Sequence, residues 1–366
     1  MSTDFAIIGG GAVGLSVAWG LLKQGYTVRI VDGGDGSFRA SRGNFGLVWV
    51  QSKGLNAPHY ARWNQISSSL WGEFAAELQE STGVNLGLEQ KGGYDYHFSE
   101  ETLQTQLAAY EALKSQLGGD YPYEVLRGNQ LRHEEPSIGT DVHAAILHYQ
   151  DGHVNPLKML HALHIDVQRL GGTYLPNRHV ETVSKSDQFV IKCRNGETFA
   201  ADRIILSAGL GAMELGPKLG FVAPIQPERG QVLITEKMPR FINRPSLIAR
   251  QVDEGGIQIG ATNEKLGLNT DVTINGIAGL AANAVRTHPC LAKVKLVRSW
   301  AALRVLSKDG LPIYQQSPTM PGAYLVTCHS AVTLAAVHAR LLPGWFDQKT
   351  DAPDLEKFSE DRFKLS

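Results

Sequence analysis

The first part of the chain alternates two short apolar runs with one stretch of helical periodicity. Residues 5–8 form a continuous apolar run of the length of a buried parallel strand. Apolar side chains then recur at helical spacing, at Val13, Val17, Leu21 and Leu22. Gly25 ends this pattern, and the β-branched run 27–31 leads into Asp32. The pattern predicts a strand–helix–strand unit at the start of the chain.

A glycine motif lies in the predicted turn between this strand and the helix. Gly9 permits a tight turn, Gly11 lets a pyrophosphate approach the backbone, and Gly14 lets the helix pack closely on the strand. The helix N-terminus favours negative charge. Asp32 follows about twenty residues later, where it can accept a hydrogen bond from an adenosine ribose and would repel a 2′-phosphate. NAD or FAD therefore fits the motif, and NADP fits it poorly.

Helical periodicity continues through the next part of the chain, at 58–80, 101–117 and 155–170. The last pattern opens with Asn155 and Pro156, which are typical of an N-cap and a first helical position. Residues 92–98 alternate in polarity and predict a strand. Its aromatic side chains could face a ligand, but packing is the more frequent role for aromatic residues at this spacing.

Strand patterns dominate the second half of the chain. Apolar, β-rich runs cover 173–183, 189–193 and 198–206. The third run ends in the small residues 207–211, which suit either backbone contact with a ligand or a compact turn. Longer strands follow at 231–235, 247–251 and 256–262, and then a helix at 274–287. This grouping predicts an antiparallel sheet distinct from the opening unit, so the expected fold class is α/β plus α+β.

Composition excludes several classes of function. The chain has 35 basic and 36 acidic residues, so its charge does not indicate a nucleic-acid or membrane partner. Cys193, Cys290 and Cys328 are far apart, which indicates neither a disulfide framework nor a metal site. The first strand begins close to Met1, and no apolar run reaches membrane-spanning length. We therefore expect an unprocessed cytoplasmic protein that acts on a small molecule.

The loop after Asp32 has the composition of a ligand-binding segment. Small residues between 38 and 49 permit close approach to a flat ligand. Arg39 and Arg42 could meet phosphates, and Ser41 and Asn44 could form hydrogen bonds. An exposed loop with solvated arginines explains the same residues equally well.

Taken in order, these motifs resemble the D-amino-acid oxidase superfamily, which contains glycine oxidase, sarcosine oxidase and D-amino-acid dehydrogenases. The resemblance covers nearly the whole chain and rests on the glycine motif with Asp32, 40–46, Ala208 with Gly209, 309–312 and His329. It implies a Rossmann-type FAD-binding domain interleaved with an antiparallel-sheet substrate domain. It also implies an enzyme that oxidises the C–N bond of an amino acid to an imine.

The resemblance further implies how two domains share the chain. The FAD-binding domain would comprise residues 1–50, 150–220 and 300–345, and the substrate-binding domain 51–149 and 221–299. Residues 346–366 would form a C-terminal tail without a place in either domain. Such a tail could pack against a partner chain or be a frayed terminus.

Segment 43–51 is most similar to the catalytic FAD subunits of bacterial multi-subunit dehydrogenases, among them opine oxidase, D-hydroxyproline dehydrogenase and hydrogen cyanide synthase. The similarity implies a secondary amine substrate, such as D-hydroxyproline or the opines octopine and nopaline. It also implies partner subunits that carry further redox centres. No cysteine stands at 312–316, where covalent-flavin sarcosine oxidases hold their linking residue, so non-covalent FAD is implied. The alternative is a stand-alone oxidase of the glycine, sarcosine or D-amino-acid type that produces hydrogen peroxide.

The resemblance places Arg304 where family members hold the substrate carboxylate. A planar guanidinium can hold a carboxylate through two parallel hydrogen bonds, although an ion pair with Asp309 or a nearby glutamate would also explain this arginine. His329 and a helix that begins near Ser330 would stabilise negative charge on the flavin. A helix cap or a packing role would explain His329 equally well.

The remaining implied contacts all belong to the cofactor, and no metal site is expected. They are Gly9, Gly11, Ala12, Val13, Gly14, Asp32, Gly33, Arg39, Ala40, Ser41, Asn44, Phe45, Gly46, Leu47, Val180, Ala208, Gly209, His329, Ser330, Val332, Thr333 and Leu334.

Two other classes of flavoprotein fit less well. An enzyme reduced by NAD(P)H would need a second nucleotide site or redox-active cysteines, but segment 209–214 lacks a final glycine and no paired cysteines occur. A non-catalytic FAD-binding subunit would not need Arg304.

Overall fold

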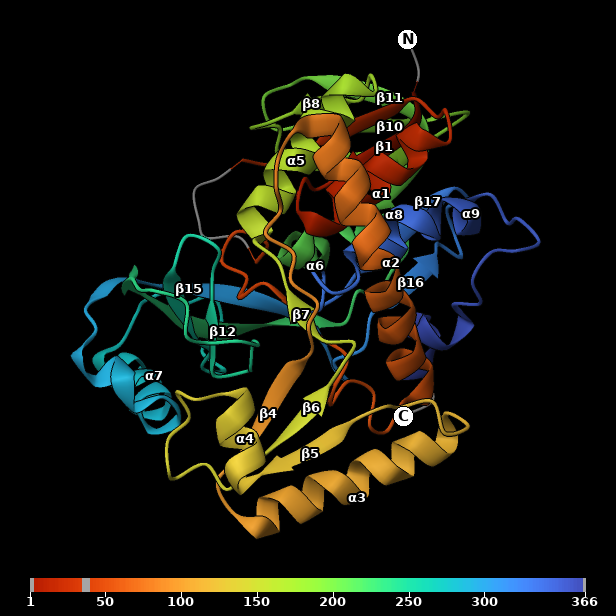
Figure 1. Ribbon diagram of the computed structural model, residues 1–366. Helices are drawn as coiled ribbons and strands as arrows, with labels where there is room; N and C mark the ends of the chain where they lie inside the picture. The colour runs from red at the N-terminus through yellow and green to blue at the C-terminus, as the bar shows by residue number, and fades with distance from the viewer. Residues whose placement is uncertain (1–2, 35–39, 365–366) are drawn as a thin grey trace.

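The computed structural model describes residues 3–34 and 40–364. A mixed eight-stranded sheet forms the upper half of the molecule (Figure 1). Its parallel strands, in spatial order, are β17 (Ala323–Thr327), β11 (Thr198–Leu206), β1 (Thr3–Ile8), β2 (Val28–Val31) and β8 (Thr173–Leu175). β16 (Ile313–Gln316) extends one edge antiparallel, and the hairpin of β9 (Val180–Lys185) and β10 (Phe189–Cys193) pairs with β11. The strand–helix–strand unit expected at the start of the chain is confirmed.

A layer of helices packs on this sheet. α1 (Ala12–Lys23) connects β1 to β2 and contacts α5 (Pro156–Arg169), α8 (Ala335–Arg340) and α9 (Leu342–Phe346). α2 (Pro58–Thr82) packs on α5 and α8. Trp19, Trp71 and Phe74 are buried in the core that these helices share with the sheet. This layer holds the start of α1 at the ends of the parallel strands.

Two antiparallel sheets form the lower half (Figure 1). The four-stranded sheet contains, in spatial order, β13 (Ala249–Gln251), β14 (Gly256–Gly260), β12 (Ile225–Lys237) and β15 (Leu296–Ser307), and α7 (Ile274–Thr287) packs on it. The three-stranded sheet contains β4 (Gly93–His97), β6 (Ala144–His148) and β5 (Glu124–Arg127). β5 leads into α4 (Gly128–Glu134). The fold class expected from the sequence is therefore confirmed.

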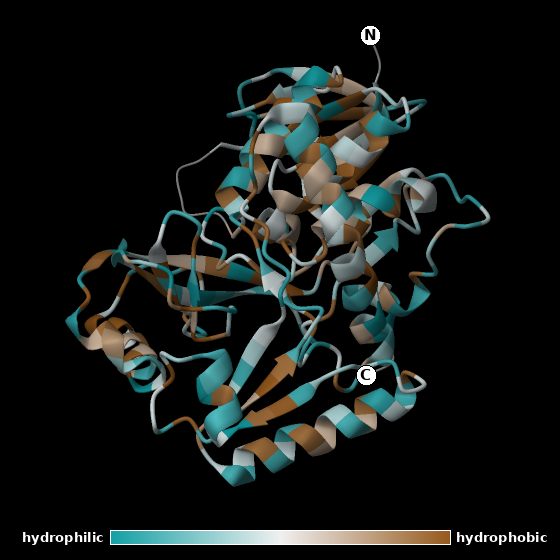
Figure 2. Ribbon diagram, viewed as in Figure 1, coloured by the Kyte–Doolittle hydropathy of each residue, from teal (hydrophilic) through white to brown (hydrophobic). Residues whose placement is uncertain are grey.

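Helix α3 (Glu100–Gln116) covers the three-stranded sheet. Figure 2 shows hydrophilic and hydrophobic residues alternating along it, which is typical of a helix with one buried face. β3 (Leu47–Val48) pairs with β7 (Gly152–His153) between the two halves. Tyr94 and Tyr96 of β4 are buried in an apolar cluster, so packing is the role that the structure shows for them. Within the described residues, no helix combines the length and apolar composition needed to cross a membrane.

The chain crosses between the halves at points that differ from the expected boundaries. α2 was expected in the substrate-binding domain but packs on the helices of the upper half, because Trp71, Phe74 and Leu78 of its buried face belong to the core of that half. Residues 300–307, expected in the FAD-binding domain, continue β15 in the four-stranded sheet. The single strand expected at 173–183 is two strands, β8 and β9, separated by a turn in which Asn177 has a φ of 57°. A short α6 (Ala212–Leu215) follows the turn after β11.

The C-terminal segment also differs from the expected tail, because its described part is packed on the chain. Phe358 is buried and its ring lies 5.5 Å from that of Tyr314. Glu360 is buried and accepts hydrogen bonds at 2.9 Å from the N–H groups of Val222 and Ala223. Neither a frayed terminus nor an unplaced tail describes residues 346–364.

Gly20 allows α1 to contact α8 closely, because a Cβ at this position would collide with the carbonyl oxygen of Ala339. We expect Gly20→Ala to lower the free energy of unfolding by about 1–3 kcal/mol, the usual cost of overpacking. Gly72→Ala in α2 is the control, since an added Cβ meets no atom within 4 Å there. It should raise the free energy of unfolding by about 0.5–1 kcal/mol, because alanine favours helix. Denaturant unfolding measures both, and equal effects would contradict the role of this contact.

Candidate functional site

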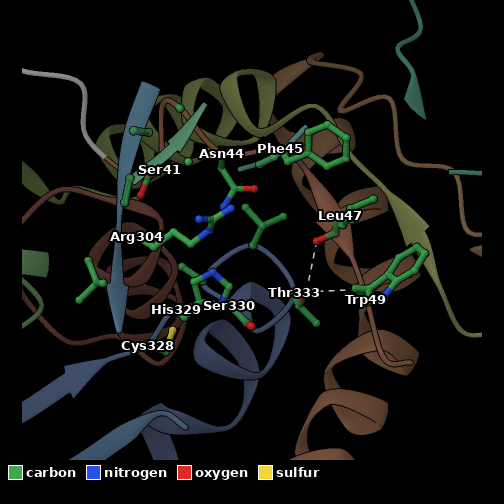
Figure 3. A pocket seen from close by; sticks show the side chains of 18 of the residues that line it. Ser41, Asn44, Phe45, Leu47, Trp49, Arg304, Cys328, His329, Ser330 and Thr333 are labelled. Atoms are coloured by element: carbon green, nitrogen blue, oxygen red, sulfur yellow. Dashed lines mark hydrogen bonds between the residues drawn. The ribbon is translucent and has the colours of Figure 1, made fainter. Parts of the chain in front are cut away.

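A cavity of about 390 Å³ lies where the two halves of the molecule meet. Its main walls are the loop 40–53 after β2, strands β12 and β15, and residues 328–333 after β17. β2 and β17 both end here, so the cavity lies at the carboxyl edge of the parallel sheet, where ligands of α/β proteins bind. Ser41, Asn44, Arg304 and His329 are among its lining residues (Figure 3).

The glycine motif forms a close contact between β1, β11 and α1. Gly9 has a φ of 110°, and a Cβ there would lie 2.8 Å from the Cα of Ala208. A Cβ at Gly14 would collide with the carbonyl oxygen of Gly9. At Gly11, in contrast, an added Cβ would meet only Ser41 Oγ, at 3.0 Å. Packing therefore requires Gly9 and Gly14, whereas at Gly11 an added Cβ would press only on the side chain of Ser41.

Two side chains connect this turn to the residues that follow β2. Asp32 is buried and accepts a hydrogen bond from the Gly10 N–H at 2.6 Å. Ser41 Oγ accepts a hydrogen bond from the Ala12 N–H at 2.9 Å. The glycine turn, the acid and the loop are thus one unit at the N-terminus of α1, which is the arrangement that dinucleotide binding requires.

Thr333 joins the loop after β2 to the turn after β17. Its Oγ1 accepts a hydrogen bond from the Trp49 N–H at 3.1 Å and donates one to the Leu47 carbonyl at 3.2 Å (Figure 3). On the other side of the loop, the buried guanidinium of Arg250 donates to the Phe45 carbonyl. These bonds hold the backbone of the loop in one place beside the cavity.

The segment after β17 differs from the expected helix. Residues 331–334 form turns and α8 begins at Ala335, several residues after Ser330. The Leu334 N–H donates to the Ser330 carbonyl, but the Ala335 N–H donates to Val332, so the regular helical ladder starts late. His329 lies beside Ser330 in the wall of the cavity (Figure 3). Burial, followed by the charges of Lys53 and Arg304, lowers the pKa of His329 to about 3, so its ring is neutral at pH 7.

Arg304, on β15, directs its guanidinium into the cavity (Figure 3). Its Nη1 donates to Glu228 Oε1 at 3.1 Å and to the Thr262 carbonyl at 2.8 Å. Arg304 therefore forms the ion pair with a nearby glutamate that was expected as an alternative, and this glutamate is Glu228. Arg304 does not pair with Asp309, whose Oδ2 accepts a hydrogen bond from Arg362 at 2.7 Å. The pair with Glu228 orients Arg304, and the guanidinium remains part of the cavity wall.

The structure brings many of the predicted residues to this cavity. They are Ala40, Ser41, Asn44, Phe45, Leu47, Arg304, His329, Ser330, Val332 and Thr333, with Gly46 and Leu334 next to them in the chain. A second group gathers around the strand ends and the start of α1, namely Gly9, Gly11, Ala12, Val13, Gly14, Asp32, Gly33, Val180, Ala208 and Gly209. Arg39 lies outside the described residues. Arg42 lines a separate cavity of about 300 Å³. The individual cofactor contacts stay predictions.

Among the lining residues that the reasoning from sequence missed are Gln51, Ser52 and Lys53. Lys53 Nζ donates to Ser330 Oγ at 3.0 Å. Burial, followed by the charge of Arg304, lowers the pKa of Lys53 to about 8. The available signal was a run of three polar residues directly after the apolar segment 47–50.

Residues 4–343 match the protein family described as FAD dependent oxidoreductase. The chain belongs to this family. It is 41% identical over 364 residues to an opine oxidase subunit of Agrobacterium tumefaciens (strain Ach5), a match that covers 98% of this chain and 97% of the relative. The corresponding opine oxidase subunit of Rhizobium meliloti is 39% identical over 361 residues, with the same coverage of 98% and 97%. Glycine oxidase from Geobacillus kaustophilus, 24% identical, has the same fold, with a TM-score of 0.91 over 98% of each chain.

The cofactor of this enzyme is FAD, and the residues of the chain fit it. Gly11 is the N-cap residue of α1 and brings no side chain to this helix N-terminus, where a pyrophosphate would be held. Asp32 is the acidic residue expected beside an adenosine ribose. The cavity between the loop and residues 328–333 would hold the flavin ring system. The expected class of enzyme and its cofactor are thereby confirmed.

Gly11→Val should abolish FAD binding, because the larger side chain would occupy the space before the helix N-terminus. The purified variant should lack flavin absorbance while its circular dichroism stays that of a folded chain. Gly72→Ala is the control and should keep FAD. The wild-type protein should release intact FAD on acid precipitation, in agreement with non-covalent binding. Stoichiometric flavin in Gly11→Val would show that the motif does not hold the cofactor.

Proposed function

We propose that this enzyme oxidises the C–N bond of an amino acid to an imine, which water then hydrolyses. The substrate is a secondary amine, such as an opine of the octopine or nopaline type or D-hydroxyproline. The observation that carries this proposal is the presence of the Arg304 guanidinium in the same cavity as the neutral ring of His329. Two relatives that match nearly the whole chain are named as opine oxidase subunits, which supports the same reaction.

Arg304 would hold the substrate carboxylate and so orient the Cα–H bond. Its guanidinium is half-buried and oriented by Glu228, and a pre-oriented guanidinium loses little freedom when it binds a carboxylate. The chemistry that FAD would supply at this site is acceptance of a hydride from the substrate carbon. His329 would face the negative charge that develops on the reduced flavin, and its neutral ring can donate a single hydrogen bond there.

The electrons would then pass to a partner subunit rather than chiefly to oxygen. The relatives are named as subunits, which supports a heteromeric complex. Among the described residues, no group of three or more His, Cys, Asp or Glu is arranged to hold a metal ion. A second candidate function is a stand-alone oxidase that yields hydrogen peroxide, favoured by the fold that the chain shares with glycine oxidase. The cytoplasmic location stays a prediction.

Arg304→Lys should weaken binding of the substrate far more than binding of FAD, because an ammonium cannot form the two parallel hydrogen bonds that a guanidinium forms with a carboxylate. We expect the apparent affinity in anaerobic flavin reduction to fall by about tenfold to a hundredfold, the loss of one charge-assisted hydrogen bond. Arg298→Lys is the matched control, because Arg298 is exposed on the same strand and does not line the cavity. Unchanged reduction kinetics in Arg304→Lys would remove Arg304 from the substrate site.

The isolated chain should turn over slowly in air and faster with an artificial dye as electron acceptor. Oxygen uptake and dye bleaching, measured with the same amine substrate, give the two rates. Co-expression with the genes next to its own should yield a stable complex in which the dye is no longer needed. Rapid stoichiometric peroxide production by the chain alone would instead establish the stand-alone oxidase.

A further inference from the structure

The cavity has a marked imbalance of charge. Two cationic side chains line it, Arg304 from β15 and Lys53 from the loop before α2. None of the described residues in its lining is an aspartate or a glutamate. Glu228 pairs with Arg304, while the hydrogen bond of Lys53 is to the neutral hydroxyl of Ser330. A buried cation without an anion costs free energy, so the cavity favours a ligand that brings negative charge to Lys53 as well as to Arg304.

Arg304 and Lys53 line the same cavity, and their charges affect the pKa values of groups in its wall. The charge of Arg304 is the largest cause, after burial, of the lowered pKa of Lys53. Both cations also lower the pKa of His329, which lies in the same wall. One carboxylate on Arg304 would leave Lys53 without a counter-charge in the cavity, whereas a second carboxylate would neutralise it.

The backbone around Lys53 is held in place for such a role. Gln51 Nε2 donates to Asp151 Oδ2 at 2.7 Å and to the Gly93 carbonyl at 3.0 Å. The Ser52 N–H donates to the Tyr121 hydroxyl at 3.1 Å. Ser52 has a φ of 63°, a left-handed conformation in the turn just before Lys53. These contacts come from the three-stranded sheet and its surroundings, so the lower half of the molecule positions this cation.

We propose that Lys53 sets the specificity of this cavity by holding the second carboxylate of a secondary amine whose first carboxylate is held by Arg304. This inference rests on the proposed amine oxidation and narrows its substrate. A monocarboxylate such as D-hydroxyproline leaves Lys53 without an anion among the described residues that line the cavity. The other lining residues are uncharged and include both apolar side chains, such as Val232 and Leu247, and polar ones, such as Asn263. A second carboxylate on the substrate supplies the missing anion.

The test compares two amines that differ by one carboxylate, by anaerobic reduction of the holoenzyme flavin. The reference amine is N-(1-carboxyethyl)alanine, and N-ethylalanine lacks its second carboxylate. The wild-type flavin should be reduced at least about tenfold faster, per molar substrate, by the reference amine than by N-ethylalanine. Lys53→Met should remove the preference over N-ethylalanine, and Lys53→Arg should keep it. Lys91→Met, which alters a lysine outside the cavity, should match the wild type.

Each outcome bears on a different statement. Equal preference in the wild type and Lys53→Met, with unchanged FAD content, would overturn the role of Lys53. If Lys53→Met does not fold, wild-type binding of glutarate against butyrate, followed by the flavin spectrum, decides the matter, and equal affinities contradict the inference. Reduction of the wild-type flavin by N-ethylalanine or proline alone keeps amine oxidation and refutes the dicarboxylate, whereas reduction by no amine refutes the proposed function itself.

Discussion

The structure depends on the close approach of α1 to the ends of β1 and β11. Gly9 and Gly14 have no Cβ, and a side chain at either position would collide with backbone atoms of Ser207 or of Gly9 itself. The Ser207 hydroxyl donates to the Gly9 carbonyl at 3.2 Å, which joins the two strand ends at this point. Because interiors are close-packed, a small displacement here would move the whole start of the helix. Asp32 and Ser41, which bond to N–H groups of this turn, would lose their partners.

From this contact the cavity is assembled by segments that are distant in sequence. Thr333 holds the loop of residues 47–49 through two hydrogen bonds, and Lys53 and Tyr60 both bond to Ser330. Arg304 reaches the same space from the antiparallel sheet. Only the combination of a parallel sheet edge, a loop and a strand from the second sheet encloses a site in which two cations and a neutral histidine act together.

The C-terminal segment contributes to this assembly although it does not line the cavity. Glu360 binds the N–H groups of Val222 and Ala223, shortly before β12 begins at Ile225. Arg362 pairs with Asp309, shortly after β15 ends at Ser307. The segment therefore attaches the points at which the chain enters and leaves the strands that carry Gly230 and Arg304. Glu360 is itself buried, and a buried carboxylate that bonds two backbone N–H groups is costly to remove, so this attachment is strong.

The sequence alone determined what depends on local spacing. The glycine motif, the periodicity of α1 and α5, and Asp32 at the end of a strand follow from contacts between near neighbours, and the family resemblance added Arg304 and His329. The tertiary structure decided what depends on distant groups. The packing of α2 on the upper half, the fold of residues 346–364, and the pairing of Arg304 with Glu228 follow from buried contacts that no local pattern encodes. Lys53 is the clearest case, because a lysine in a polar loop is usually solvated, and only enclosure beside Arg304 makes its charge part of a site.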